Sequence, residues 1–185
     1  MLNTENATLK KVLENKEIGD LLTAMGCGIN PCEPAKLRYQ RIILLADADS
    51  DGHHITTLLL TLFYRHLPEL IRDGRVFIAM PPLYRVDIGK ETYWASDEPD
   101  RERILKEHAK GNAKPDITRF KGLGEMMPKV LWETTLNPKT RRLLRVEIAD
   151  PLETDRVMSD LMGKDPAARF RFIMEHADQA EAVDV

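Results

Sequence analysis

The chain has 185 residues, of which 43% are hydrophobic and 31% are charged, and its formal net charge is −3. This composition is typical of a globular protein rather than a disordered chain, and the apolar runs are too short to cross a bilayer. We therefore expect one domain, or one domain with a smaller second one, and no membrane association. Residues 2–6 lack the apolar segment of a signal peptide, which predicts a cytoplasmic location.

The spacing of apolar residues predicts helices and strands along the chain. Helices are expected at residues 7–25, 55–71, 99–110, 128–135, 138–144, 152–162 and 166–177. Strands are expected at residues 41–46, 76–80, 83–88 and 92–95, the last two around the turn Gly89-Lys90. Asp150 and Asp165 each precede a proline, which is typical of an N-cap followed by the first helical residue. The strand–helix–strand order of 41–80 predicts a right-handed crossover, a parallel sheet and hence an α/β core.

Positive charge is concentrated between Thr118 and Arg145. This window holds seven Lys or Arg residues against two Glu residues, so it carries +5 while the rest of the chain carries −8. Such a patch suits contact with a polyanion, although a solvated helix face explains it equally well. Cys27 and Cys32 are the only cysteines, and we expect free thiols because two thiols cannot form a four-cysteine zinc site.

Three aspartates, Asp47, Asp49 and Asp51, follow directly after the predicted strand at 41–46. Their mutual repulsion needs a cation to offset it. A calcium-binding EF-hand would need a glutamate at loop position 12, where this chain has Leu58. Ligands bind at the carboxyl ends of strands in open α/β sheets, and carboxylates without sulfur ligands suit Mg²⁺, or Mn²⁺ in its place, better than zinc. A turn that caps a helix is the simpler alternative, and it explains one or two of the acids.

The string Ala46-Asp-Ala-Asp-Ser-Asp-Gly-His-His-Ile55 resembles the second acidic motif of the TOPRIM domain of type IIA DNA topoisomerases. Four further segments are similar to the bacterial B-type subunits, gyrase B and topoisomerase IV ParE: PPLY at 81–84, TRFKGLGEM at 118–126, WETT at 132–135 and NPKTRRLL at 137–144. The motifs come in the family's order and cover nearly the whole chain. Some of them, such as Ala48-Asp-Ser-Asp-Gly52, favour the ParE side without excluding gyrase B.

The resemblance implies a Rossmann-like TOPRIM fold, a parallel sheet with flanking helices that here lacks its first strand. This domain would occupy residues 1–112, with a small β insertion at 83–96. A mainly helical C-terminal region of the gyrase B type would follow at residues 113–185.

The resemblance also implies metal-assisted DNA cleavage and religation. In the family, Mg²⁺ is held by the acidic motif, matched here by Asp47, Asp49 and Asp51, and by a glutamate in an earlier E-G-D-S-A-type motif. The nucleophilic tyrosine belongs to an A-type partner subunit of the ParC/GyrA kind. No E-G-D-S-A occurs in this chain. We therefore expect it to lack the catalytic glutamate, the ATPase domain through which the family uses ATP, and activity on its own. The missing N-terminal part of the B-type subunit would be a further partner.

Double-stranded DNA is the other partner that the resemblance implies. Lys121 in the K-G-L-G segment matches a backbone contact best, because glycines let phosphate approach closely and lysine supplies charge. His54, Arg119 and Arg169 are further candidates, and a hydrogen bond at a helix start explains His54 equally well. Such contacts would be independent of sequence and sensitive to salt.

Two functions follow from these features. The chain is either the DNA-gate and metal-binding portion of the B-type subunit of an ATP-dependent type IIA topoisomerase, or an orphan, non-catalytic TOPRIM module that binds DNA or the A-type subunit. The intact acidic triad favours the first function, and the absent motif glutamate favours the second.

Overall fold

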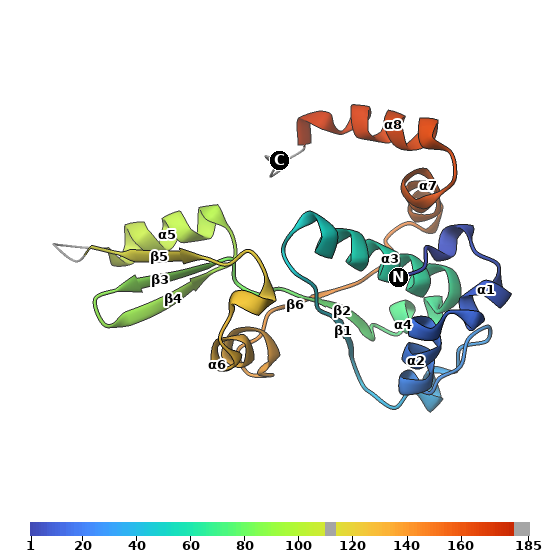
Figure 1. Cartoon of the computed structure of the whole chain (residues 1–185), viewed down its shortest axis with the longest axis horizontal. Coiled ribbons are helices and arrows are strands. Elements are labelled where there is room, and N and C mark those ends of the chain that lie inside the picture. The colour runs from blue at the N-terminus through green and yellow to red at the C-terminus, as the bar shows by residue number, and fades with distance from the viewer. Residues whose placement is uncertain (110–113, 180–185) are drawn as a thin grey trace. The chain divides into compact units, whose positions relative to one another are not determined.

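The computed structural model describes residues 1–109 and 114–179, which form two compact units (Figure 1). The first unit is built from Met1–Gln40, Thr57–Arg75 and the described part of Glu147–Val185, and the second from Arg41–Thr56 and Val76–Val146. The predicted domain boundary between residues 112 and 113 lies outside the described residues, so it stays a prediction.

The second unit contains the predicted pair of parallel strands. β1 (Ile42–Leu44) pairs in parallel with β2 (Val76–Ala79), which confirms the α/β core expected from the order of elements. On its other side β2 pairs antiparallel with β6 (Leu143–Arg145). The prediction of a helix at 138–144 is wrong, because pairing with a strand far away in the sequence decides the conformation of these residues.

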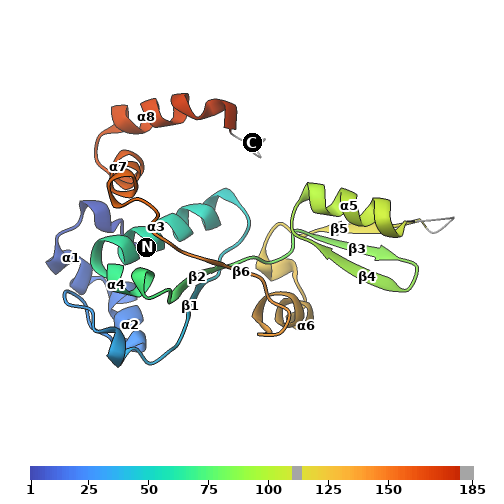
Figure 2. The ribbon, with the colours of Figure 1, turned by 180° about the vertical axis from the view of Figure 1, so that it is seen from behind.

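A second sheet in the same unit has the strand order β4-β3-β5. β3 (Tyr84–Ile88) and β4 (Glu91–Ala95) form the predicted hairpin, and β5 (Asp116–Arg119) pairs antiparallel with the other edge of β3. Helix α5 (Glu98–His108) lies along this sheet in both views (Figure 1, Figure 2). The predicted last residue of that helix, Lys110, lies outside the described residues.

The core of this sheet and helix is formed by alternate residues of β3. Its side chains are buried and half-buried in turn along the strand, as expected for a strand with one face on a core. The buried cluster consists of Tyr84, Val86, Ile88, Ala95 and Ile104.

Helical segments that follow β5 complete the second unit. They are the 3₁₀ turn η3 (Leu123–Glu125), α6 (Pro128–Leu131) and the π-helical turn η4 (Trp132–Leu136). The predicted helix at 128–135 is thus confirmed as a continuous helical stretch whose second half is π-helical.

The first unit is mainly helical. It contains α1 (Leu9–Glu14), α2 (Lys16–Met25), the later turns of α3 (Ser50–His66), α4 (Pro68–Arg72), α7 (Pro151–Met162) and α8 (Pro166–Glu175), with 3₁₀ turns at Thr4–Asn6, Pro34–Lys36 and Ala177–Gln179. Val12, Ile18 and Leu62 form a buried cluster in it. The predicted aspartate caps are confirmed: Asp150 accepts hydrogen bonds from the N–H groups of the first turn of α7, and Asp165 does so for α8.

The helix predicted at 7–25 is two helices. Asn15 ends α1, and its side chain accepts a hydrogen bond from the N–H of Ile18 at 3.1 Å and so begins α2. Asparagine is a strong N-cap residue, so the break follows from local chemistry. Similarly, Pro68 begins α4 instead of bending the helix before it.

The structure also bears on the expected lack of membrane-spanning helices and on the state of the two cysteines. None of the helices among the described residues has the length and apolar character needed to cross a membrane. Cys27 and Cys32 are free and buried. Burial, together with a side-chain hydrogen bond to Cys27, raises the pKa of the Cys32 thiol to about 12.

Candidate metal and nucleic-acid site

Asp47 lies just after β1 and contacts the glycine loop, as we call residues 121–126. Its Oδ1 accepts a hydrogen bond from the backbone N–H of Leu123 at 2.7 Å. A Cβ placed on Gly122 would lie 3.3 Å from both Cγ and Oδ1 of Asp47. The acidic motif and the K-G-L-G segment are thus in direct contact.

The glycine loop is a tight turn held by its own hydrogen bonds. Glu125 donates its N–H to the carbonyl of Gly122, and Met126 donates to that of Leu123, both at 3.1 Å. The Glu125 carboxylate accepts the N–H of Lys121 at 2.8 Å, and the Met126 side chain is buried. This turn leaves Lys121 exposed.

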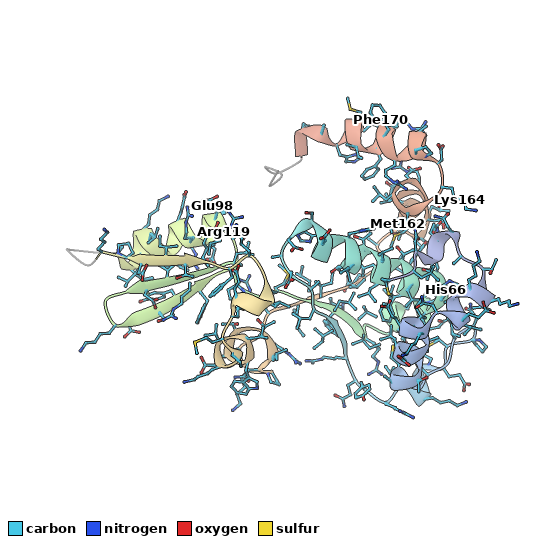
Figure 3. The ribbon with its side chains drawn as sticks, in the orientation of Figure 1. His66, Glu98, Arg119, Met162, Lys164 and Phe170 are labelled. Carbon is cyan, nitrogen blue, oxygen red and sulfur yellow. The ribbon has the colours of Figure 1, made fainter. Side chains whose placement is uncertain are left out.

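Arg119 lies two residues before Lys121, at the end of β5 (Figure 3). Its side chain is also exposed. The end of β5 and the start of the glycine loop therefore present two cationic side chains that are close together in the sequence.

Asp49 caps helix α3. Its Oδ1 accepts the N–H of Gly52 at 2.7 Å, and its carbonyl accepts the N–H of His53 at 3.0 Å. A Cβ on Gly52 would lie 2.1 Å from the carbonyl oxygen of Asp47, so only glycine fits where the chain folds back over that residue. The capping alternative therefore explains Asp49, while Asp51 is exposed in the first turn of α3.

The structure does not bring the three aspartates together as a metal cluster. Among residues 1–109 and 114–179, no group of three or more His, Cys, Asp or Glu side chains is placed so that it could hold a metal ion. Asp47 is directed at the glycine loop and Asp49 at the backbone of α3. Their assignment as metal ligands is therefore a proposal.

The remaining predicted DNA contacts differ in their surroundings. His54 is exposed on α3 within the second unit. Arg169 belongs to α8 of the first unit, and its guanidinium donates to the carbonyls of Leu161 and Gly163 at 2.8 and 2.9 Å. These bonds satisfy the end of α7, which gives Arg169 a structural role.

The basic window includes residues with local partners. Arg142 donates to the Ser96 hydroxyl at 2.9 Å, and Lys129 lies 3.8 Å from the Glu133 carboxylate in an exposed pair. Arg142 also lines a cavity of about 460 Å³, whose other lining residues are Met80, Pro82, Trp94, Ser96, Glu133, Thr134, Asn137 and Thr140. The lining of this cavity contains none of the three aspartates of the acidic motif.

The backbone N–H of Leu123 is a member of the site that was not expected from the sequence. A main-chain donor leaves no side-chain signature in a sequence. The two glycines around Leu123 were the only hint, because glycine allows another group to approach the backbone closely.

Comparison with known families defines the class of protein. The Toprim domain model matches residues 4–81, and the model for the carboxyl terminus of the DNA gyrase B subunit matches residues 112–174. The chain is therefore an α/β Toprim domain followed by a gyrase B-type C-terminal region.

Whole-chain relatives agree with this class. The DNA gyrase B subunit of Thermotoga maritima is 47% identical over 186 residues, which cover 100% of this chain and 29% of the relative. The DNA gyrase B subunit of Haloferax volcanii is 50% identical with the same coverage. The DNA topoisomerase 4 B subunit of Rickettsia conorii is 44% identical over 179 residues, 96% of this chain and 27% of the relative. The chain belongs to the family of type IIA topoisomerase B subunits, and it spans less than a third of the length of these relatives.

Proposed function

We propose that this chain forms the metal- and DNA-binding portion of the DNA gate in the B-type subunit of an ATP-dependent type IIA topoisomerase. In this role it supports Mg²⁺-dependent DNA cleavage and religation by the tyrosine of an A-type partner. The observation that carries the proposal is the hydrogen bond between Asp47 and Leu123. This bond connects the Asp47 carboxylate, which can bind a cation, to the glycine loop, which can bind a phosphate.

The residues near Asp47 fit a hard divalent cation. An ionised carboxylate has about four lone-pair positions, and the Leu123 N–H occupies one of them. Mg²⁺ is usually held by one or two carboxylates, with waters and substrate phosphates completing its shell. Asp47 with Asp49 or Asp51 would therefore suffice without a closed three-carboxylate cluster. When bound, the ion would offset negative charge on a DNA phosphate.

The glycine loop and the end of β5 supply the DNA contacts in this proposal. Lys121 in the glycine loop and Arg119 at the end of β5 would provide the positive charge. A Cβ on Gly124 would meet no atom within 4 Å, which leaves room for a phosphate. His54 would add a contact from the start of α3. Backbone contacts of this kind bind DNA without regard to its sequence and weaken as salt rises.

The experiment that tests the proposal is binding of a double-stranded oligonucleotide, followed by fluorescence anisotropy at several salt concentrations, with Mg²⁺ and with EDTA. Lys121→Gln should weaken binding and reduce the slope of log affinity against log salt by about one. Lys90→Gln removes the same charge from the β3–β4 turn and should leave binding unchanged. Mg²⁺ should strengthen binding by the native chain but not by Asp47→Asn, which keeps an acceptor for the Leu123 N–H while losing the charge. Equal effects of the two lysine variants, or Mg²⁺ dependence in Asp47→Asn, would contradict the proposal.

A further inference from the structure

The hydrogen bond to Asp47 comes from the main chain of a distant segment, so the carboxylate and the glycine loop hold each other in place. We infer that the glycine loop is the positioning element of the metal site, and that cation binding at Asp47 and the conformation of the loop carrying Lys121 are coupled. This inference rests on the proposed function, because it takes Asp47 as a cation ligand.

Gly122 lies against the Asp47 carboxylate. A Cβ at this position would lie 3.3 Å from Cγ and Oδ1 of Asp47 and 3.4 Å from Oδ2. The backbone of Gly122 is extended, with φ −151° and ψ 165°, a conformation that any residue adopts. A side chain at this position would therefore press on the Asp47 carboxylate and displace it by a few tenths of an ångström, whereas the backbone itself does not require glycine.

The glycine loop is also held in one conformation by its own contacts. The N–H groups of Lys121, Glu125 and Met126 are all bonded within the turn, and Met126 is buried. A small hollow is lined by residues of both segments, including Ala48, Lys121 and Leu123. These contacts fix the position from which the Leu123 N–H donates to the Asp47 carboxylate.

Coupling follows from these two constraints. A group that hydrogen-bonds to a metal ligand sets the orientation of that ligand and tunes its affinity. The Leu123 N–H bonds to one carboxylate oxygen, so a cation on Asp47 must compete with this bond or share the carboxylate with it. In either case cation binding alters the turn that presents Lys121. If the cation changes the affinity of the loop for a phosphate by some factor, thermodynamic linkage requires that the phosphate change the affinity for the cation by that same factor.

The structure offers a matched pair of variants for the test. Gly122→Ala places a methyl group against the Asp47 carboxylate, whereas Gly124→Ala adds the same methyl group in the same turn with no atom within 4 Å. Mn²⁺ is the probe, because electron paramagnetic resonance measures its free concentration directly. Loss of a partner that orients a metal ligand typically weakens binding by about 10–100-fold. We therefore expect about tenfold weaker Mn²⁺ binding in Gly122→Ala and native affinity in Gly124→Ala.

A second measurement follows the loop itself. In the native chain and in Gly124→Ala, Mg²⁺ should shift the amide NMR resonance of Leu123, and in Asp47→Asn it should not. A Leu123 amide that ignores Mg²⁺ in a native chain that binds the ion would overturn the coupling.

The outcomes separate the inference from the proposed function. If the native chain binds no Mn²⁺, the metal part of the proposed function fails and the inference fails with it. If the native chain binds Mn²⁺ and both alanine variants bind it equally well, only the inference is overturned. Should Gly122→Ala not fold, Leu123→Pro replaces it, since proline is tolerated at the first position of a helical turn and lacks the N–H. Its control, Leu123→Ala, keeps the N–H, and equal Mn²⁺ affinity in the two would overturn the inference.

Discussion

Arg65 on α3 joins three segments of the first unit, and its removal gives the sharpest test of how that unit is held together. Its guanidinium donates to both carboxylate oxygens of Glu5, from Nε at 2.5 Å and from Nη2 at 2.8 Å. It also contacts the Asp155 carboxylate and the Ser159 hydroxyl of α7. Arg65→Met removes all of these donors while it keeps an unbranched apolar stem.

The size of the effect can be estimated from the exposure of the partners. The side chain of Glu5 is 12% exposed and that of Arg65 is 24% exposed, whereas Asp155 is 55% exposed. Removing one partner of a buried pair costs about 3–5 kcal/mol, and an exposed pair contributes about 0–1 kcal/mol. Because Glu5 lies between these limits, Arg65→Met should lower the free energy of unfolding by about 2–3 kcal/mol. Asp155→Asn should lower it by less than about 1 kcal/mol.

Urea unfolding followed by far-UV circular dichroism measures both variants. For a chain of this size, the Arg65→Met loss corresponds to a fall in Tm of roughly 5–10 °C. The loss should persist at high salt, because a partly buried pair is screened less than an exposed one. If Asp155→Asn destabilised the chain as much as Arg65→Met, or if Arg65→Met cost less than about 1 kcal/mol, the reasoning from burial would be refuted.

Two further predictions concern the core and the response to pH. Leu62 is fully buried and Leu152 is 84% exposed. Leu62→Ala should therefore lower the free energy of unfolding by about 2–5 kcal/mol, and Leu152→Ala should leave it almost unchanged. Equal losses in urea unfolding would contradict this difference in burial. A hydrogen bond from the Thr92 hydroxyl, aided by Arg85, lowers the pKa of Asp87 below its usual 3.8 despite some burial. The stability that the Asp87 carboxylate contributes is therefore present above that usual pKa and is lost as pH falls through the lower folded value. Thr92→Val should raise the Asp87 pKa in a carboxyl NMR titration, and an unchanged value would argue against this hydrogen bond.

Features set by local chemistry could be predicted from the sequence. Asp150 and Asp165 cap helices as expected, because an N-cap needs only a short polar side chain and the N–H groups two or three residues later. The β3–β4 hairpin formed around Gly89 as expected, where the glycine adopts a positive φ of 64°.

Features set by distant contacts could not be predicted in the same way. Residues 143–145 carry a Leu-Leu pair that fits a helix, yet they form a strand because β2 offers an open edge to them. The same holds for the site. The three acids stood out as a motif, but the sequence could not show that Asp49 would be occupied with capping α3 while Asp47 turned toward Leu123.

The most direct test of the central claim, that the Asp47 carboxylate holds a divalent cation beside the glycine loop, is an anomalous diffraction measurement on crystals soaked in Mn²⁺. An anomalous peak at about 2.1 Å from a carboxylate oxygen of Asp47 is the predicted result, the distance being that of a small hard cation. A map with no peak within reach of Asp47, from crystals in which the Leu123 N–H still contacts that carboxylate, would contradict it.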